Sequence, residues 1–193
     1  MIYRIAHVLF NIVNFFWLNI TVEGEENVPD TGRAVICANH MYWYDPLLID
    51  TVIKRPIRPV NFMAKAEIFK NKFVNWILKE VHVFPVERHK VSMTTLRTAM
   101  GILNNDELLG IFPEGTRVKP GQKVKPADGF LFFALKTKSP IVPVHIDGSY
   151  KFRGKIRVTF GKPIELKEYY GKRLTAQQNE KIGQEILDQI YQL

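Results

Sequence analysis

Short apolar runs alternate along the chain with longer amphipathic stretches. Apolar runs of four to six residues, many of them rich in Val, Ile and Phe, predict β-strands at 20–23, 33–38, 59–64, 81–86, 108–112, 141–146 and 156–160. Helical periodicity between these runs predicts helices at 46–54, 68–79, 92–103 and 130–136, and a last helix after a Thr175 cap. The alternation predicts an α/β fold: a single domain with a central, mostly parallel or mixed sheet of about seven strands flanked by helices.

The first 20 residues are more apolar than the rest and predict a separate amphipathic helix. Its polar residues recur at spacings of three and four, which places them on one narrow stripe: Arg4, His7, Asn11 and Asn14. The longest unbroken apolar run, 15–18, is far shorter than the roughly 20 residues of a spanning helix. No cleavage site of small residues follows it. The segment 1–20 therefore either docks on the protein's own core or lies in a membrane interface, while 21–193 forms the α/β domain.

Charge and composition narrow the class of partner. The 193-residue chain has a formal charge of +8, which favours anionic partners such as phosphorylated ligands, nucleic acid or an anionic bilayer. A hydrophobic content of 46% excludes a disordered chain. Cys37 is the single cysteine, so no internal disulfide or Cys-rich zinc site is possible, and a cytosol-facing location is the simplest inference. Cys37 falls in a predicted strand and is expected in the core.

A histidine and an aspartate follow the predicted strand 33–38. Asp45 precedes Pro46, which predicts that Asp45 caps a helix whose first residue is Pro46. His40 then lies in the preceding turn and meets Asp45 only if the turn folds back. In that case the carboxylate fixes the imidazole tautomer, and the other ring nitrogen is free to remove a proton. Otherwise Asp45 is a cap alone and His40 is an ordinary turn residue.

A second polar segment, 112–117, follows the predicted strand 108–112. Gly115 permits close approach of the backbone to a ligand, Thr116 adds a hydroxyl, and Arg117 offers a planar fork for phosphate. The same residues also suit a plain β-turn. Because α/β sheets place ligand sites at strand ends, the two segments together favour a functional site.

Asn39-His40 with Asp45, followed by Phe-Pro-Glu-Gly-Thr-Arg at 112–117, resembles the glycerolipid acyltransferases, specifically the bacterial 1-acyl-sn-glycerol-3-phosphate acyltransferase group. Two further blocks, 65–88 and 141–144, are similar to the same family, so the resemblance covers roughly residues 20–165.

The resemblance implies transfer of a fatty acyl group from a thioester to the sn-2 hydroxyl of lysophosphatidic acid, giving phosphatidic acid. By position, His40 is the general base and Asp45 orients it. Backbone N–H groups near Gly115 and Thr116 are candidates for holding the oxyanion. Glu114 braces the loop or contacts the acceptor. The expected phosphate ligands are Lys65, Arg88 and Arg117. No cofactor is implied, and the acyl donor is a thioester of acyl carrier protein or of coenzyme A.

Ten Lys or Arg against two acids between residues 115 and 160, together with the apolar N-terminal helix, favour a peripheral location on the cytoplasmic face of an anionic membrane. The remaining histidines show no metal-ligand spacing, so no metal is expected. Two alternatives stay open: an acyltransferase for a related acceptor, such as glycerol 3-phosphate or another lysolipid, and a non-catalytic membrane-surface protein. No nucleic-acid-binding motif accompanies the basic residues, which argues against a nucleic-acid partner.

Overall fold

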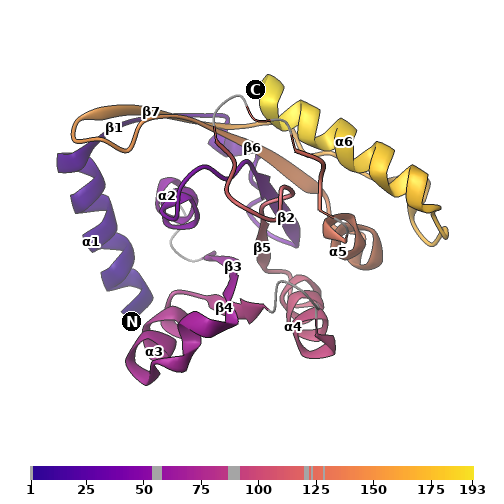
Figure 1. Ribbon diagram of the computed structural model, residues 1–193, viewed down its shortest axis with the longest axis horizontal. Helices are drawn as coiled ribbons and strands as arrows, with labels where there is room; N and C mark the ends of the chain where they lie inside the picture. The colour runs from indigo at the N-terminus through magenta and orange to yellow at the C-terminus, as the bar shows by residue number, and fades with distance from the viewer. Residues whose placement is uncertain (1, 54–57, 87–91, 120–121, 123, 128) are drawn as a thin grey trace.

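The computed structural model describes residues 2–53, 58–86, 92–119, 122, 124–127 and 129–193 (Figure 1). The helices are α1 (Ile2–Trp17), α2 (Asp45–Val52), α3 (Lys72–Glu80), α4 (Met93–Asn104), α5 (Phe130–Thr137) and α6 (Ala176–Gln192), with short 3₁₀ turns η1 (Glu25–Asn27), η2 (Ala66–Lys70) and η3 (Lys167–Tyr169). The strands are β1 (Leu18–Glu23), β2 (Ala34–Ala38), β3 (Val60–Lys65), β4 (Val83–Val86), β5 (Leu108–Ile111), β6 (Ile141–Gly148) and β7 (Gly154–Phe160).

The seven strands form one sheet in the order β1-β7-β6-β2-β5-β3-β4. Every neighbouring pair is parallel except β6 and β7, which are antiparallel. The predicted single α/β domain with a mostly parallel sheet of about seven strands is confirmed.

Two predicted helices have different boundaries in the structure. The N-terminal helix ends at Trp17 because residues 18–23 pair with β7 instead. The predicted helix 68–79 is divided into η2 and α3 at Asn71, whose side chain accepts hydrogen bonds from the N–H groups of Phe73 and Val74. This N-cap starts a new helix axis.

Helices cover both faces of the sheet (Figure 1). Side chains of β2 alternate between two buried clusters: Ile36 lies with α2 on one face, and Val35 and Cys37 lie with α4, α5 and α6 on the other. All five residues of β2 are buried, as expected of a central parallel strand. Cys37 is in the core as predicted, and burial raises the pKa of its thiol.

The parallel pairing of β2 with β5 brings the two polar segments together. Cys37 lies opposite Ile111, so the residues that follow both strands emerge at the same edge of the sheet. The carboxyl ends of parallel strands are the usual ligand edge of an α/β sheet.

Gly110 in β5 is required by close packing. A Cβ at this position would lie 2.2 Å from the ring of Phe62, so Gly110→Ala forces that buried ring to move. We expect the free energy of unfolding to fall by about 1–3 kcal/mol, measured by denaturant titration. Gly101→Ala in α4 is the matched control, because no atom lies within 4 Å of its added Cβ. A helix-interior alanine there should be neutral or stabilising, and equal losses in both variants would exclude the packing explanation.

Candidate active site

The turn after β2 folds back and brings His40 and Asp45 together. His40 Nδ1 lies 2.8 Å from Asp45 Oδ2, and the Asp45 side chain is fully buried. The expected capping role of Asp45 is wrong. Asp45 is the first residue of α2, Tyr44 occupies the cap position, and the carboxylate points back toward the turn, where it accepts the N–H groups of Met41 and Tyr42.

The Asp45 carboxylate accepts four hydrogen bonds. Its Oδ2 accepts from His40 and from the backbone N–H groups of Met41 (2.6 Å) and Tyr42 (2.7 Å). Its Oδ1 accepts from the Tyr150 hydroxyl at 2.6 Å. Burial and the neighbouring carboxylate raise the pKa of Tyr150, which keeps this hydroxyl a donor. The carboxylate, and with it the imidazole, is therefore held in one orientation.

Glu114 joins the second polar segment to the first. Its Oε2 accepts the backbone N–H of His40 at 2.7 Å, and its Oε1 accepts the hydroxyl of Tyr191 in α6. Burial raises the pKa of the Glu114 carboxyl, although hydrogen bonds from Tyr191 and His40 oppose the increase. Val118 completes the connection by donating its N–H to the His40 carbonyl at 2.8 Å. The segment 112–118 is thus fastened to the backbone of the histidine turn.

Aromatic packing and one buried amide hold the position of the turn. The imidazole of His40 stacks on Phe112 with a centroid distance of 4.0 Å, and Phe112 stacks in turn on Phe62 at 5.6 Å. The side-chain amide of Asn39 donates to the carbonyl of Ile146 and accepts its N–H. This pair of hydrogen bonds connects the end of β2 to β6, its neighbour in the sheet.

The remaining predicted site residues form no described hydrogen bond or ion pair with the hydrogen-bond network of His40. Gly115 has a φ of +66°, and its N–H is bonded to the Phe112 carbonyl at 3.0 Å. Thr116 and Arg117 are exposed beside it. Lys65 ends β3 and pairs with Glu67 at 3.1 Å. Arg88 lies outside the described residues. Within the described part of the chain, no hydrogen bond or ion pair joins Lys65 or Arg117 to the residues around His40.

Sequence reasoning did not find Tyr150 or Tyr191. Their partners lie 105 and 77 residues away, and neither tyrosine belongs to a recognisable motif. One signal was available for Tyr150: it follows β6, which pairs parallel with β2 and therefore ends at the same edge as His40.

Helix α1 docks on the domain through polar contacts and leaves its apolar face exposed. The buried Asn14 side chain donates to Thr51 at 3.0 Å and accepts from the Tyr44 hydroxyl at 2.7 Å, and Trp17 Nε1 donates to the Tyr150 carbonyl at 3.2 Å. Eight large apolar side chains are 50–75% exposed: Ile5, Val8, Leu9, Ile12, Val13, Phe15, Phe16 and Trp17. Among the described residues, no helix has the length and apolarity needed to span a bilayer.

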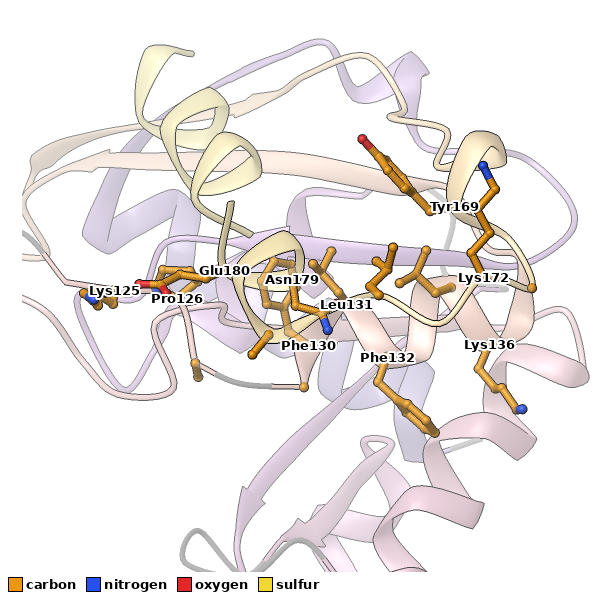
Figure 2. A pocket seen from close by; sticks show the side chains of 16 residues that line it. Lys125, Pro126, Phe130, Leu131, Phe132, Lys136, Tyr169, Lys172, Asn179 and Glu180 are labelled. Atoms are coloured by element: carbon orange, nitrogen blue, oxygen red, sulfur yellow. Dashed lines mark hydrogen bonds and ion pairs between the residues drawn. The ribbon is translucent and has the colours of Figure 1, made fainter. Parts of the chain in front are cut away.

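A cavity of about 850 Å³ lies elsewhere, between α5 and the start of α6 (Figure 2). Apolar side chains such as Phe130 and Phe132 line it, with Lys125 toward one end and Lys136 and Lys172 toward the other. None of its lining residues belongs to the groups around His40. In the described ranges, no three His, Cys, Asp or Glu side chains are grouped as metal ligands.

Both the sequence and the fold of this chain match known proteins. The sequence profile of the Acyltransferase family matches residues 19–147, which include both polar segments. The chain belongs to this family, and it is an acyltransferase related to the bacterial 1-acyl-sn-glycerol-3-phosphate acyltransferases.

Relatives and a solved structure agree with this assignment. The 1-acyl-sn-glycerol-3-phosphate acyltransferase of Bacillus subtilis is 30% identical over 155 residues, which cover 78% of this chain and 76% of the relative. The enzyme of the same name from Borreliella burgdorferi is 31% identical over 137 residues, 70% of this chain and 54% of the relative. The crystal structure of the 1-acyl-sn-glycerophosphate (LPA) acyltransferase PlsC from Thermotoga maritima superposes with a TM-score of 0.70 at 25% identity, covering the whole of this chain and 78% of that one.

Proposed function

We propose that this acyltransferase transfers a fatty acyl group from a thioester of acyl carrier protein or coenzyme A to the sn-2 hydroxyl of 1-acyl-sn-glycerol 3-phosphate. The product is phosphatidic acid, so the reaction belongs to phospholipid synthesis. The observation that carries the proposal is the 2.8 Å contact between His40 Nδ1 and the buried Asp45 carboxylate. The relatives that bear this name support the choice of acceptor.

His40 acts as the general base. With Nδ1–H donated to Asp45, the lone pair of Nε2 is free to accept the proton of the acceptor hydroxyl. The alkoxide oxygen forms a bond to the thioester carbonyl carbon, and the carbonyl π electrons move to oxygen. When the tetrahedral intermediate collapses, the C–S bond breaks and the thiolate leaves with the proton that His40 carried. Asp45 stabilises the imidazolium between the two steps.

The oxyanion needs fixed donors near His40. The Gly115 N–H already donates to Phe112, so of the two expected donors the N–H of Thr116 is the better candidate. The positive φ of Gly115 turns the backbone at this point. Glu114 has both carboxylate oxygens engaged, which favours bracing of the loop over contact with the acceptor.

The acceptor phosphate is assigned to Lys65, Arg88 and Arg117. Lys65 ends β3 and Arg117 follows β5, two adjacent parallel strands, so both emerge at the edge that holds His40. Arg117 offers a planar pair of donors to a phosphate, and its exposure leaves it accessible to a ligand.

The exposed face of α1 is proposed to lie in the interface of an anionic membrane, on its cytoplasmic side. Eight half-exposed apolar side chains on one 16-residue helix are costly in water and suit the headgroup boundary of a bilayer. Trp17 at the end of α1 bonds to the residue that holds Asp45, so a lipid acceptor reaches His40 beside the membrane surface.

The first experiment follows thiol release from palmitoyl-acyl carrier protein and palmitoyl-coenzyme A, with wild type in liposomes. Release that requires lysophosphatidic acid supports the proposal, and the active thioester identifies the donor. Release only with glycerol 3-phosphate or another lysolipid would reassign the acceptor. Absence of release with every pair would refute the proposed reaction.

Tyr150→Phe should lower kcat about tenfold and leave KM unchanged. The variant keeps the ring contacts of Tyr150 with Tyr42 and Tyr44 but removes the hydrogen bond to the buried Asp45. Tyr42→Phe is the matched control, because the Tyr42 hydroxyl forms no hydrogen bond with any described residue. The activity of this variant should be close to that of wild type. Steady-state kinetics with saturating donor separate the two constants. A Tyr150→Phe enzyme with wild-type kcat would remove the positioning role.

A further inference from the structure

A second group of exposed apolar side chains lies on η2 and α3. Ile68, Phe73, Trp76 and Ile77 are 38–67% exposed. The last three recur at spacings of three and four, so they share one face of α3. No residue of α3 is buried in the protein, and the helix contacts mainly η2 and β4, at the edge of the sheet.

Lysines lie beside this apolar face. Lys70, Lys72 and Lys79 are exposed on η2 and α3, and Lys65 precedes them. Two acids stand against these four lysines in residues 65–80: Glu67, which pairs with Lys65, and Glu80. Apolar and aromatic side chains next to an excess of lysines match the boundary of a bilayer that contains anionic lipids.

Helix α3 lies next to the start of α1 (Figure 1). The ring of Tyr3 contacts that of His82, two residues after α3 ends, with a centroid distance of 5.2 Å. Tyr3 also donates to Asp50 in α2, so this end of α1 is fixed to the domain. The apolar faces of the two helices therefore belong to rigidly connected elements.

We propose that η2 and α3 form a second membrane-binding element, which docks on an anionic bilayer together with α1. This inference rests on the peripheral location proposed above. It adds a second surface that fixes the orientation of the domain on the membrane. A single helix lying in an interface leaves the domain free to roll about the helix axis. A second contact beside the first residues of α1 stops that rotation and holds the His40 edge at a constant height above the membrane. A second copy of this chain is a poorer occupant, because it would bring the lysines of both copies together.

The test compares vesicle binding by wild type and Phe73→Ser/Trp76→Ser, using cosedimentation with mixed phosphatidylglycerol and phosphatidylcholine vesicles. We expect the α3 variant to bind at least about tenfold more weakly, because two large apolar side chains no longer enter the interface. Met93→Ser is the matched control: Met93 is 63% exposed at the start of α4, which packs on the face of the sheet opposite α2, and its loss should not change binding. Phe15→Ser/Phe16→Ser reports the contribution of α1.

Fluorescence gives a second measurement that requires no change in α3. In Trp17→Phe/Trp43→Phe, Trp76 is the remaining tryptophan of the chain. Its emission should shift to the blue on addition of anionic vesicles and should be quenched by lipids brominated near the headgroups. Acyl transfer to a short-chain acceptor in detergent should be unchanged in the α3 variant, which shows that the variant is folded.

Two results would overturn the proposal. In the first, the α3 variant binds vesicles as tightly as wild type and the emission of Trp76 does not shift. That result would leave α1 as the membrane contact and would have no bearing on the proposed acyltransferase reaction. A change in oligomeric state of the α3 variant in lipid-free solution, without a change in vesicle binding, would show that a second copy covers the face. Failure of the proposed reaction is detected separately, as absence of thiol release by wild type.

Discussion

His40→Ala should lower kcat by about 10²-fold or more, with lysophosphatidic acid as acceptor. The variant removes the group that accepts the hydroxyl proton, while Asp45 keeps its hydrogen bonds from Met41, Tyr42 and Tyr150. The turn should therefore stay in place, and the loss should be in the chemical step. Thiol release at saturating donor and acceptor measures it.

The matched control for this variant removes a different imidazole. His82 directly precedes β4 and has a φ of +59°, a conformation that asparagine tolerates, so His82→Asn loses the ring contact with Tyr3 but should keep the backbone turn and near wild-type activity. Thermal unfolding of both variants should resemble that of wild type. If His40→Ala retained more than about a tenth of wild-type kcat, the general-base assignment would be wrong.

Asp45→Asn should lose about 10²- to 10⁴-fold in kcat. An amide keeps an acceptor for the donors at Oδ2, but it no longer carries the negative charge that stabilises the imidazolium, and its NH₂ group faces the hydroxyl of Tyr150. We expect KM for both substrates to change little, because Asp45 is fully buried and has no surface open to a ligand.

A second substitution at this position separates stability from chemistry. Asp45→Ala leaves four donors without their acceptor in a buried site, each costing about 1–3 kcal/mol, so we expect it to unfold or aggregate. Asp45→Asn should remain folded by circular dichroism. An Asn variant with full activity would show that Asp45 serves the fold alone.

The part of the site that the sequence predicts is the part encoded by local spacing. His40 and Asp45 are five residues apart, and the segment 112–117 follows a neighbouring parallel strand, so strand order alone brings these residues together. The capping prediction for Asp45 failed because it considered only the helix that follows. The buried carboxylate accepts from three donors in the turn and from Tyr150, which follows β6, so it is turned away from the helix N-terminus.

The contact between Tyr191 and Glu114 could not be predicted from the sequence. Tyr191 reaches Glu114 because α6 runs back along the sheet, and no spacing or periodicity records that path. The sequence also does not predict that the apolar face of α1 is exposed, because a helix with one polar stripe fits either a protein core or a membrane interface. Asn14 resolves the packing: the polar side chain is the one that faces the domain.

The pairing of β1 with β7 limits when the N-terminal part of the chain can fold during synthesis. β1 follows α1 directly, yet it is an edge strand whose neighbour in the sheet is β7, more than 130 residues later. Helix α1 therefore leaves the ribosome early but cannot take its final place until β7 has been made. Its apolar face is exposed even after docking, so early contact with a lipid surface or a chaperone would protect the nascent chain from aggregation during that interval.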